Sequence, residues 1–389
     1  MDFRDTPEQA IWRQEVRTFL DNEKPKIDPE ANPMEAMRRA GGYMKEWREK
    51  LSNKGWVAPA WPKEYGGASL SVMEQFIMNE EFAEARAMNV GGMGTSMIGP
   101  TIIIHGNEEQ KKQHLGAILR GEVQWCQGYS EPGSGSDLAS LQTRAVRDGD
   151  DFVINGQKIW TSGAHNADWM FMLARTDPDA PKHRGISFLL IDDIKNTPGL
   201  TIRPLINMAN RHHFNEVFFE DVRIPANQVV GEVNRGWYHL AVALDFERSG
   251  IGAYAGGRKR VERLMKLAKD HPELAERRPS IRHELADRHI EVTTGTFLSY
   301  RVAHMQAKGL VPNHEASASK LFGSELSQRI GKTGMSMLGM LGQLRNGSKQ
   351  EIMDIATPYL SSMSSTVAAG TSEIQRNIIA TRGLGLPRG

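Results

Sequence analysis

The chain has 389 residues, of which 39% are hydrophobic and 24% charged, so it has an ordinary globular balance and is too long for one compact core. Its 48 lysines and arginines against 47 aspartates and glutamates leave a formal net charge of +1, which gives no electrostatic reason to expect nucleic acid or an anionic membrane as a partner. We therefore expect a globular protein of two or three domains without such partners.

The cysteine content and the N-terminus indicate where the protein is found. Cys126 is the sole cysteine, so no disulfide forms within the chain and a reducing compartment fits. Charged residues at positions 2, 4, 5 and 8 occupy the stretch in which a signal peptide needs an apolar core. The sequence has no apolar run near the roughly 18 residues that a membrane-spanning helix needs. We therefore expect a cytoplasmic protein.

The first part of the chain, residues 1–125, has the pattern of a helical domain. Thr6 offers a helix N-cap, Pro7 stands at the first helical position, and Gln9 occupies the capping-box position. Apolar residues then recur at helical spacing over positions 11–20, and helical patterns return over 73–87 and 108–119. These patterns predict an N-terminal helical domain with turn-rich loops between its helices.

Residues 126–233 have a different periodicity, typical of short β-strands. Asn155-Gly156 lies between two apolar segments, 152–154 and 158–160, and this pair predicts a hairpin turn because both residues tolerate positive φ. Further strands are predicted over 169–174, 186–191, 200–205 and 216–219, with Pro, Gly and Asp between them. No helical pattern is interleaved, so the sheet is predicted to be antiparallel.

From residue 234 to residue 389 the pattern is helical again. Long segments with apolar stripes cover 236–268, 280–308 and 314–341, and a shorter one follows Gly370. Long helices with short connections are typical of an antiparallel bundle. The predicted fold class is therefore α+β, with an N-terminal helical domain, a central antiparallel β domain and a C-terminal helical bundle.

Several familiar ligand-binding motifs are incomplete in this sequence. Gly-Lys-Thr at 331–333 lacks the glycine that a phosphate-binding loop needs five positions earlier, and the glycine spacing at 250–255 lies in a helical pattern without a βαβ unit. His-Glu at 283–284 has an aspartate where a zinc protease needs its second histidine, and the two histidines at 212–213 have no further ligand nearby. We therefore predict no metal site.

Three segments carry small and polar residues in a pattern that suits a cofactor. The loop at 130–137 reads Ser-Glu-Pro-Gly-Ser-Gly-Ser-Asp, and it supplies hydroxyls, backbone N–H groups and little bulk, which suits phosphates and a flat ring. Taken alone, such a loop most often binds no ligand. It is followed by Asn-Gly-Gln-Lys-Ile-Trp-Thr-Ser-Gly at 155–163 and, near the C-terminus, by Gly-Thr-Ser-Glu-Ile-Gln-Arg at 370–376.

Together with Trp-Pro-Lys-Glu-Tyr-Gly-Gly at 61–67 and Val-Phe-Phe-Glu-Asp-Val-Arg-Ile-Pro at 217–225, these segments resemble the acyl-CoA dehydrogenase family in order and spacing, over essentially the whole chain. The resemblance implies FAD held between the central domain and a C-terminal four-helix bundle. It also implies that the following residues contact FAD: Gln127, Tyr129, Ser130, Gly135, Ser136, Trp160, Ser162, Thr371 and Glu373.

The same resemblance implies different places for these residues along the cofactor. Trp160 and Ser162 are expected at the isoalloxazine ring, and Ser136 along FAD or the pantetheine of the substrate. Thr371 and Glu373 occupy positions that contact FAD across the fold or across a subunit boundary.

The family reaction, known from β-oxidation and lipid metabolism, desaturates the α,β bond of an acyl-CoA thioester to the trans-2-enoyl-CoA. A carboxylate takes the α proton and flavin N5 takes the β hydride, so the base must be desolvated and aligned. Many members carry that glutamate just before the terminal Gly-Thr, where this chain has Ala369. Others carry it on the first bundle helix. The resemblance thus implies Glu247 as the catalytic base and Arg248 at the thioester end of coenzyme A.

The resemblance also bears on partners. Homotetrameric members carry Arg-x-x-Phe-Gly in the bundle, which reaches the FAD of a neighbouring subunit, whereas this chain reads Arg-Pro-Ser-Ile-Arg-His at 278–283. The Gln and Gly-Gly of the third bundle helix are also replaced, around 336–342. Similar losses occur in heteromeric bacterial members, some of which act on steroid side chains. We expect a heterotetramer with a related chain, with a homotetramer as the alternative, and electron transfer flavoprotein as the electron acceptor.

Two other functions stay open from the sequence. An acyl-CoA oxidase or nitroalkane oxidase has the same fold and passes electrons to oxygen, although acyl-CoA oxidases usually carry an extra C-terminal domain. A non-catalytic subunit of a heteromeric enzyme would fit Ala369 and the missing bundle motif, whereas Glu247 and the intact segments at 130–137 and 160–162 oppose it. The acyl group, whether straight, branched, long or steroid-like, also stays open.

Overall fold

The computed structural model describes residues 3–25, 33–245, 250–344 and 354–387, without the side chains of 33–41 and 241–245. The chain divides into two compact units. The sheet unit comprises Glu23–Leu70 and Asn89–Glu247, and the helical unit comprises Met1–Asn22, Ser71–Met88 and Arg248–Gly389. The segment predicted as one N-terminal helical domain therefore contributes helices to both units.

The sheet unit is built on one seven-stranded sheet with the order β1-β4-β2-β3-β7-β6, in which β5 also pairs with β4. Its strands are β1 (Trp125–Gly128), β2 (Arg144–Asp148), β3 (Asp151–Lys158), β4 (Trp169–Arg175), β5 (Ile186–Ile191), β6 (Leu200–Ile206) and β7 (His212–Pro225). Most neighbours are antiparallel, as predicted, but β1 and β2 both run parallel to β4. A parallel pair needs a long crossover, and residues 129–168, which include the β2–β3 hairpin, supply it.

The predicted hairpin turn at Asn155-Gly156 is wrong. The turn lies instead between β2 and β3, where Asp148 pairs with Asp151 and Gly149 has a φ of +61°. Asn155 and Gly156 lie inside β3, at a shift of register against β7. Gly156 has a φ of +148°, and a Cβ there would lie 2.6 Å from Thr143 Oγ1, so the glycine serves a bulge with close backbone approach.

Strand β4 explains why the centre of the sheet lacks alternating polarity. Met170 and Met172 belong to one buried apolar cluster, whereas Phe171 and Leu173 belong to a second one. Successive side chains of a strand point to opposite faces, so β4 is buried on both sides. The second cluster also contains apolar residues of the helices in this unit, such as Ile102.

One helix of the sheet unit, α5 (Glu108–Arg120), begins and ends at recognisable caps. Asn107 and Gln110 form a capping box at its start, and Gly121 closes it in the left-handed conformation. The Gln110 amide also donates to the carbonyl oxygens of Asn227 and Val229, at 2.8 and 2.9 Å. The α-helices here are α2 (Pro33–Asn53), α4 (Gly99–His105), α5 (Glu108–Arg120) and α6 (Gly236–Asp245), and the shorter helices are η1 (Lys63–Tyr65), η2 (Gly94–Ile98), η3 (Leu138–Ser140) and η4 (Ala226–Gln228).

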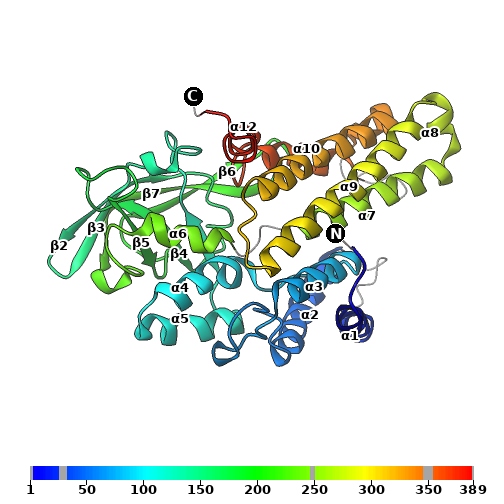
Figure 1. Cartoon of the computed structure of the whole chain (residues 1–389). Helices are drawn as coiled ribbons and strands as arrows, with labels where there is room; N and C mark the ends of the chain where they lie inside the picture. Colours follow the sequence, from blue (N-terminus) through cyan, green and yellow to red (C-terminus); the bar gives the residue numbers. More distant parts are fainter. Residues whose placement is uncertain (1–2, 26–32, 246–249, 345–353, 388–389) are drawn as a thin grey trace. The chain divides into compact units, whose positions relative to one another are not determined.

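The helical unit is organised around three long helices, α7 (Ile251–Asp270), α9 (Ile281–Ala307) and α10 (Asn313–Leu338), which pack side by side (Figure 1). Their shared core includes Val261, Val292 and Ile330. Helix α3 (Val72–Glu84), which begins at a capping box of Ser71 and Glu74, packs against α7 and α9. The remaining elements are α1 (Pro7–Glu23), α8 (Pro272–Arg277), η5 (Gly339–Gln343), α11 (Ala356–Ser362), η6 (Met363–Thr366), α12 (Ser372–Ile378) and η7 (Ile379–Gly383).

The fold class predicted from the sequence is confirmed, and a further local difference lies at the start of the C-terminal helical region. The helical pattern over 236–268 corresponds to two helices, α6 and α7, and Gly250 has a φ of +68° directly before α7. Among the residues described, no helix is both long enough and apolar enough to span a membrane.

Candidate active site

The first group of predicted site residues lies at the end of β1 and in the loop that follows it. The Tyr129 ring points into the core, where it packs edge-on against Phe171 and Phe188. Gln127 is half-buried, and its Nε2 lies 3.5 Å from Met97 Sδ. Ser130 is half-buried as well. Of these predicted residues, Gln127 and Ser130 have side chains accessible to a ligand, whereas the Tyr129 side chain belongs to the core.

Hydrogen bonds within the loop at 130–137 fix its conformation. Glu131 and Ser134 exchange two backbone hydrogen bonds of 2.9 and 3.0 Å, and Ser134 Oγ donates to the Asp137 carbonyl oxygen at 2.9 Å. Gly135 and Ser136 are exposed beyond this turn, and a Cβ on Gly135 would meet nothing within 4 Å. The loop therefore presents open, uncrowded backbone, which suits the approach of a phosphate or pantetheine chain.

The second group follows β3. Trp160 has a φ of +59°, an uncommon conformation for a bulky residue, and its side chain is 58% exposed. Phe214 supports it edge-on, with ring centroids 5.8 Å apart. Ser162 lies half-buried two residues later. An indole with this exposure can stack on a flat ring.

A buried ion pair joins the two groups. Lys158, whose side chain is completely buried, donates to the Tyr129 carbonyl oxygen at 3.0 Å and to Glu131 Oε1 at 2.7 Å. The Ile159 N–H donates to the Ser130 carbonyl oxygen at 2.9 Å. The segments that carry Ser130 and Trp160 are therefore fixed to each other at one edge of the sheet.

The environment shifts the pKa values of both partners. Burial lowers the pKa of Lys158 to about 8, although the negative charge of Glu131 acts to raise it. Burial also acts to raise the pKa of Glu131, but the Lys158 charge and hydrogen bonds from Gln142 and Thr143 bring it below its ordinary value. The backbone N–H groups of Gln142 and Thr143 donate to the carboxylate at 2.6 and 2.9 Å. Glu131 is thus stabilised as a carboxylate on several sides.

The sequence patterns assigned no role to Lys158 or Glu131, although one signal was present. Phe152, Ile154 and Lys158 have the same parity in β3, and all three side chains are buried. A lysine on the inward face of a strand needs a buried anionic partner. That partner, Glu131, is 27 positions away and could not be read from spacing.

The C-terminal group of predicted residues lies in the helical unit. Thr371 is the N-cap of α12, and its Oγ1 accepts a hydrogen bond from the Ile374 N–H at 3.2 Å. The two preceding residues both have positive φ, +53° at Ala369 and +83° at Gly370. Lys320 Nζ donates to the Gly370 carbonyl oxygen at 2.6 Å, which fixes this turn. Ala369 has no group that could accept a proton.

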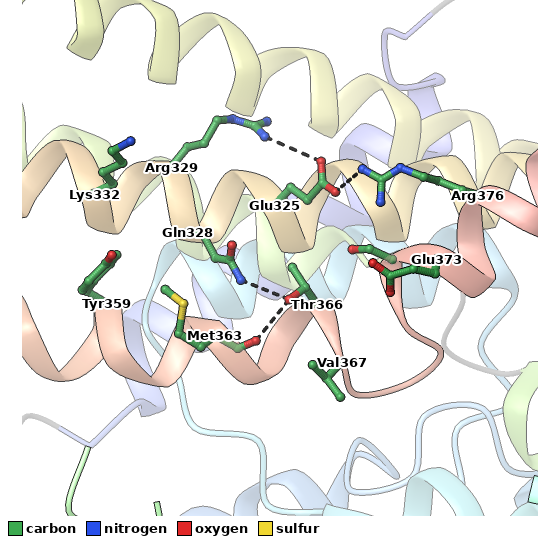
Figure 2. A pocket seen from close by; sticks show the side chains of 11 residues that line it. Glu325, Gln328, Arg329, Lys332, Tyr359, Met363, Thr366, Val367, Glu373 and Arg376 are labelled. Atoms are coloured by element: carbon green, nitrogen blue, oxygen red, sulfur yellow. Dashed lines mark hydrogen bonds and ion pairs between the residues drawn. The ribbon is translucent and has the colours of Figure 1, made fainter. Parts of the chain in front are cut away.

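A polar pocket of about 540 Å³ opens beside this turn (Figure 2). Glu373 and Ser372 line it, and the Ser372 hydroxyl is buried without a hydrogen-bond partner among the described residues. Glu325, on α10, accepts from Arg376 at 2.6 Å and lies 4.0 Å from Arg329. The pocket is also lined by Gln328, Lys332, Tyr359, Met363, Thr366 and Val367.

Two predicted residues, Glu247 and Arg248, lie outside the described residues. The last described residue before them is Asp245, which ends α6. Helix α6 packs against β5 and α4 in the sheet unit. In the described part of the chain, no group of three or more His, Cys, Asp or Glu side chains could hold a metal ion.

The residues present fit a flavin dinucleotide. Within the sheet unit the exposed Trp160 offers a stacking face, and the loop at 130–137 offers open space at Gly133 and Gly135. In the helical unit, taken by itself, the Ser372 hydroxyl lacks a partner among the described residues. A flat ring, a pyrophosphate and a polar ribose need these kinds of contact.

Comparisons with known sequences point to one protein family along the chain. Family sequence models described as the acyl-CoA dehydrogenase N-terminal, middle and C-terminal domains match residues 6–122, 126–222 and 234–384. The acyl-CoA dehydrogenase IpdE1 of Mycobacterium tuberculosis (strain ATCC 25618 / H37Rv) is 36% identical over 392 aligned positions, which cover 97% of each chain.

Two solved structures resemble the chain over its full length. A chain of the Tcur3481-Tcur3483 steroid ACAD is 33% identical, with a TM-score of 0.85 and full coverage of both chains. A chain of the ChsE4-ChsE5 complex from Mycobacterium tuberculosis is 34% identical, with a TM-score of 0.83 and full coverage of both chains.

Proposed function

This chain belongs to the acyl-CoA dehydrogenase family and is an oxidoreductase of that family, and we propose that it uses FAD to convert an acyl-CoA thioester to the trans-2-enoyl-CoA. The observation that supports FAD most directly is the buried Lys158–Glu131 pair, which holds the open loop at 130–137 beside the exposed Trp160. Bound FAD supplies the acceptor for the β hydride.

We assign the cofactor contacts to three segments. Ser130, Gly135 and Ser136 bind along the dinucleotide, with Ser136 also near the pantetheine, and Trp160 and Ser162 orient the isoalloxazine ring. Thr371 and Glu373 contribute polar contacts to the FAD of this chain or of a neighbouring subunit, and the open polar pocket beside Glu373 supports that role. Gln127 completes the lining next to the loop, and Tyr129 acts through its backbone because its ring is buried.

Glu247 is the proposed base for the α proton. The position that many family members use is Ala369 here, and an alanine side chain cannot take a proton. Glu247 follows α6 by two residues, and α6 is anchored on β5. A carboxylate in a site closed to water is a stronger base than one in solution, which suits a weak C–H acid. Arg248 would hold the thioester end of coenzyme A.

The proposed substrate class is a bulky, steroid-like acyl-CoA, and the proposed assembly is a heterotetramer with a related chain. The substrate class is supported by the name of the Tcur3481-Tcur3483 steroid ACAD. The assembly is supported by the two-component names of that enzyme and of the ChsE4-ChsE5 complex. Electron transfer flavoprotein is the proposed electron acceptor, and the cytoplasm the proposed location. A lone buried cysteine, Cys126, fits a reducing compartment.

The test is anaerobic bleaching of the oxidised flavin band by a panel of straight, branched and steroid-type acyl-CoAs, with the chain alone and with its related partner. Unmutated protein and Glu220→Gln should bleach, because Glu220 is exposed on β7, whereas Glu247→Gln should retain FAD and lose bleaching by ~1,000-fold or more in rate. Equal bleaching by Glu247→Gln would refute the assigned base. Protein that never bleaches, with or without its partner, would instead indicate a non-catalytic subunit.

A further inference from the structure

Asn215, near the start of β7, makes an unusually complete set of hydrogen bonds. It is fully buried, and its Nδ2 donates to the Thr161 carbonyl oxygen at 2.9 Å and lies 3.1 Å from His165 Nδ1. Its Oδ1 lies 2.8 Å from His212 Nε2. Both amide hydrogens and the amide oxygen are thus engaged, which leaves this side chain one orientation.

The same residue holds both backbone groups of Thr161. The Thr161 N–H donates to the Asn215 carbonyl oxygen at 3.0 Å, and the Thr161 carbonyl oxygen accepts from the Asn215 side chain. The regular pairing of β3 with β7 ends at Lys158 and Val217, and beyond that point the Asn215 side chain supplies the donor for the Thr161 carbonyl oxygen. Thr161 Oγ1, by contrast, has no hydrogen-bond partner among the described residues.

The hydrogen bonds from Asn215 to Thr161 bear on the proposed flavin site because Thr161 lies between Trp160 and Ser162 in the chain. The φ of +59° at Trp160 is costly for a bulky residue and persists only where the surroundings hold it. One residue further, the Gly163 N–H donates to the His213 carbonyl oxygen at 2.9 Å. The rings of His165 and His212, which both contact the Asn215 amide, stack on each other with centroids 3.7 Å apart.

We propose that Asn215 is a positioning residue that fixes Trp160 and Ser162 in the conformation that receives the isoalloxazine ring. The inference rests on the proposed FAD-dependent function. Asn215 acts through Thr161 and is not itself a ligand of the flavin. Loss of its amide leaves the buried Thr161 carbonyl oxygen without its donor, so the segment can relax out of the strained conformation.

The experiment is a double-mutant cycle on FAD affinity, measured by titrating FAD into apoprotein of the chain together with its partner. Asn215→Ala should weaken FAD binding by ~10-fold or more, and Asn215→Asp, which keeps the shape but cannot donate to Thr161, should do the same. In a Ser162→Ala background the effect of Asn215→Ala should be smaller than in the unmutated chain, because the part of the effect that acts through Ser162 is already lost. The fine structure of the flavin absorption band should also be lost in Asn215→Ala.

The matched control is Asn155→Ala. Asn155 also joins β3 to β7 through its amide, which donates to Asp221 Oδ1 at 2.9 Å and accepts from the Asp221 N–H at 3.0 Å, but it is exposed and far along the strand from Trp160. Its effect on FAD affinity should be small and additive with Ser162→Ala. Far-ultraviolet circular dichroism and the melting temperature report whether each variant is folded.

The outcomes separate the two proposals. Unchanged FAD affinity in folded Asn215→Ala, or an effect that adds fully to that of Ser162→Ala, overturns the positioning role and leaves the function intact. A chain that binds no FAD in any assembly overturns the function itself. If Asn215→Ala does not fold, Asn215→Asp carries the same comparison.

Discussion

Lys158 Nζ lies 2.7 Å from Glu131 Oε1, with one side chain completely buried and the other nearly so. The pair spans 27 positions of sequence and joins the loop at 130–137 to the strand that leads to Trp160. Exposed ion pairs contribute little to stability, but a buried pair behaves differently because neither charge can return to water when its partner is lost.

We therefore expect Lys158→Met to be strongly destabilising. It leaves the Glu131 carboxylate buried without its cation, and the free energy of unfolding should fall by about 3–5 kcal/mol. The double variant Lys158→Met with Glu131→Gln should recover a large part of that loss, since no buried charge remains. Urea unfolding of the unmutated protein and of both variants measures these differences. A double variant as unstable as the single one would show that packing, not charge, is the cause.

Buried histidines predict the dependence of stability on pH. His114 is completely buried between Trp125 and Trp169, and its two ring nitrogens have no hydrogen-bond partner among the described residues. Burial lowers the pKa of His114 to about 4. The folded state thus holds a neutral ring where the unfolded chain takes a proton near its ordinary pKa of 6.5.

Stability should therefore be complete above pH 6.5 and be lost as the pH falls from about 6.5 towards about 4. The loss assigned to His114 is roughly 3 kcal/mol at the low end. His114→Phe should flatten this part of the profile, measured by chemical unfolding at a series of pH values. Burial, and next the charge of His105, lowers the pKa of His239 to about 4 as well. Part of the dependence of stability on pH should therefore persist in His114→Phe. An unchanged slope in His114→Phe would contradict the assignment.

A second charged cluster lies in the helical unit, on α1 and α3. Arg13 donates to Asp5, Glu80 and Glu81 at 2.6, 2.7 and 2.7 Å, and its side chain is 14% exposed. Arg13→Met should lower the free energy of unfolding by about 3–5 kcal/mol, because three carboxylates lose their shared cation. Arg17 also pairs with Glu81, at 2.6 Å, but is 54% exposed, so Arg17→Met should cost less than about 1 kcal/mol. If both variants lost the same free energy of unfolding, burial of the arginine would not explain the difference that we expect.

The bulge in β3 predicts different costs at two glycines of the same hairpin. A Cβ at Gly156 would lie 2.6 Å from Thr143 Oγ1 and 2.7 Å from Thr143 Cα, so Gly156→Ala should cost about 2–3 kcal/mol or shift the strand. At Gly149 a Cβ meets nothing within 4 Å, and only the φ of +61° opposes it, so Gly149→Ala should cost about 1 kcal/mol. Thermal unfolding of both variants compares them directly.

The sequence by itself determined the class of the fold and the family. Helical periodicity in the first and last parts of the chain and short apolar segments in the middle follow from contacts between near neighbours, which a sequence displays directly. The order and spacing of the segments at 130–137, 155–163 and 370–376 carried the resemblance to the family, and the cofactor contacts that it implies stay predictions. The boundaries after residues 125 and 233, and the roles of Glu247 and Arg248, stay predictions.

Only the tertiary structure decided which distant residues meet. The Asn-Gly pair at 155–156 has the local preferences of a turn, yet the approach of Thr143 and the pairing with β7 place it in a bulge. The bond from Asn215 to Thr161 joins residues 54 positions apart, as the Lys158–Glu131 pair joins residues 27 apart. Local conformational preference is encoded residue by residue, whereas the partner of a buried polar group depends on how the whole sheet packs.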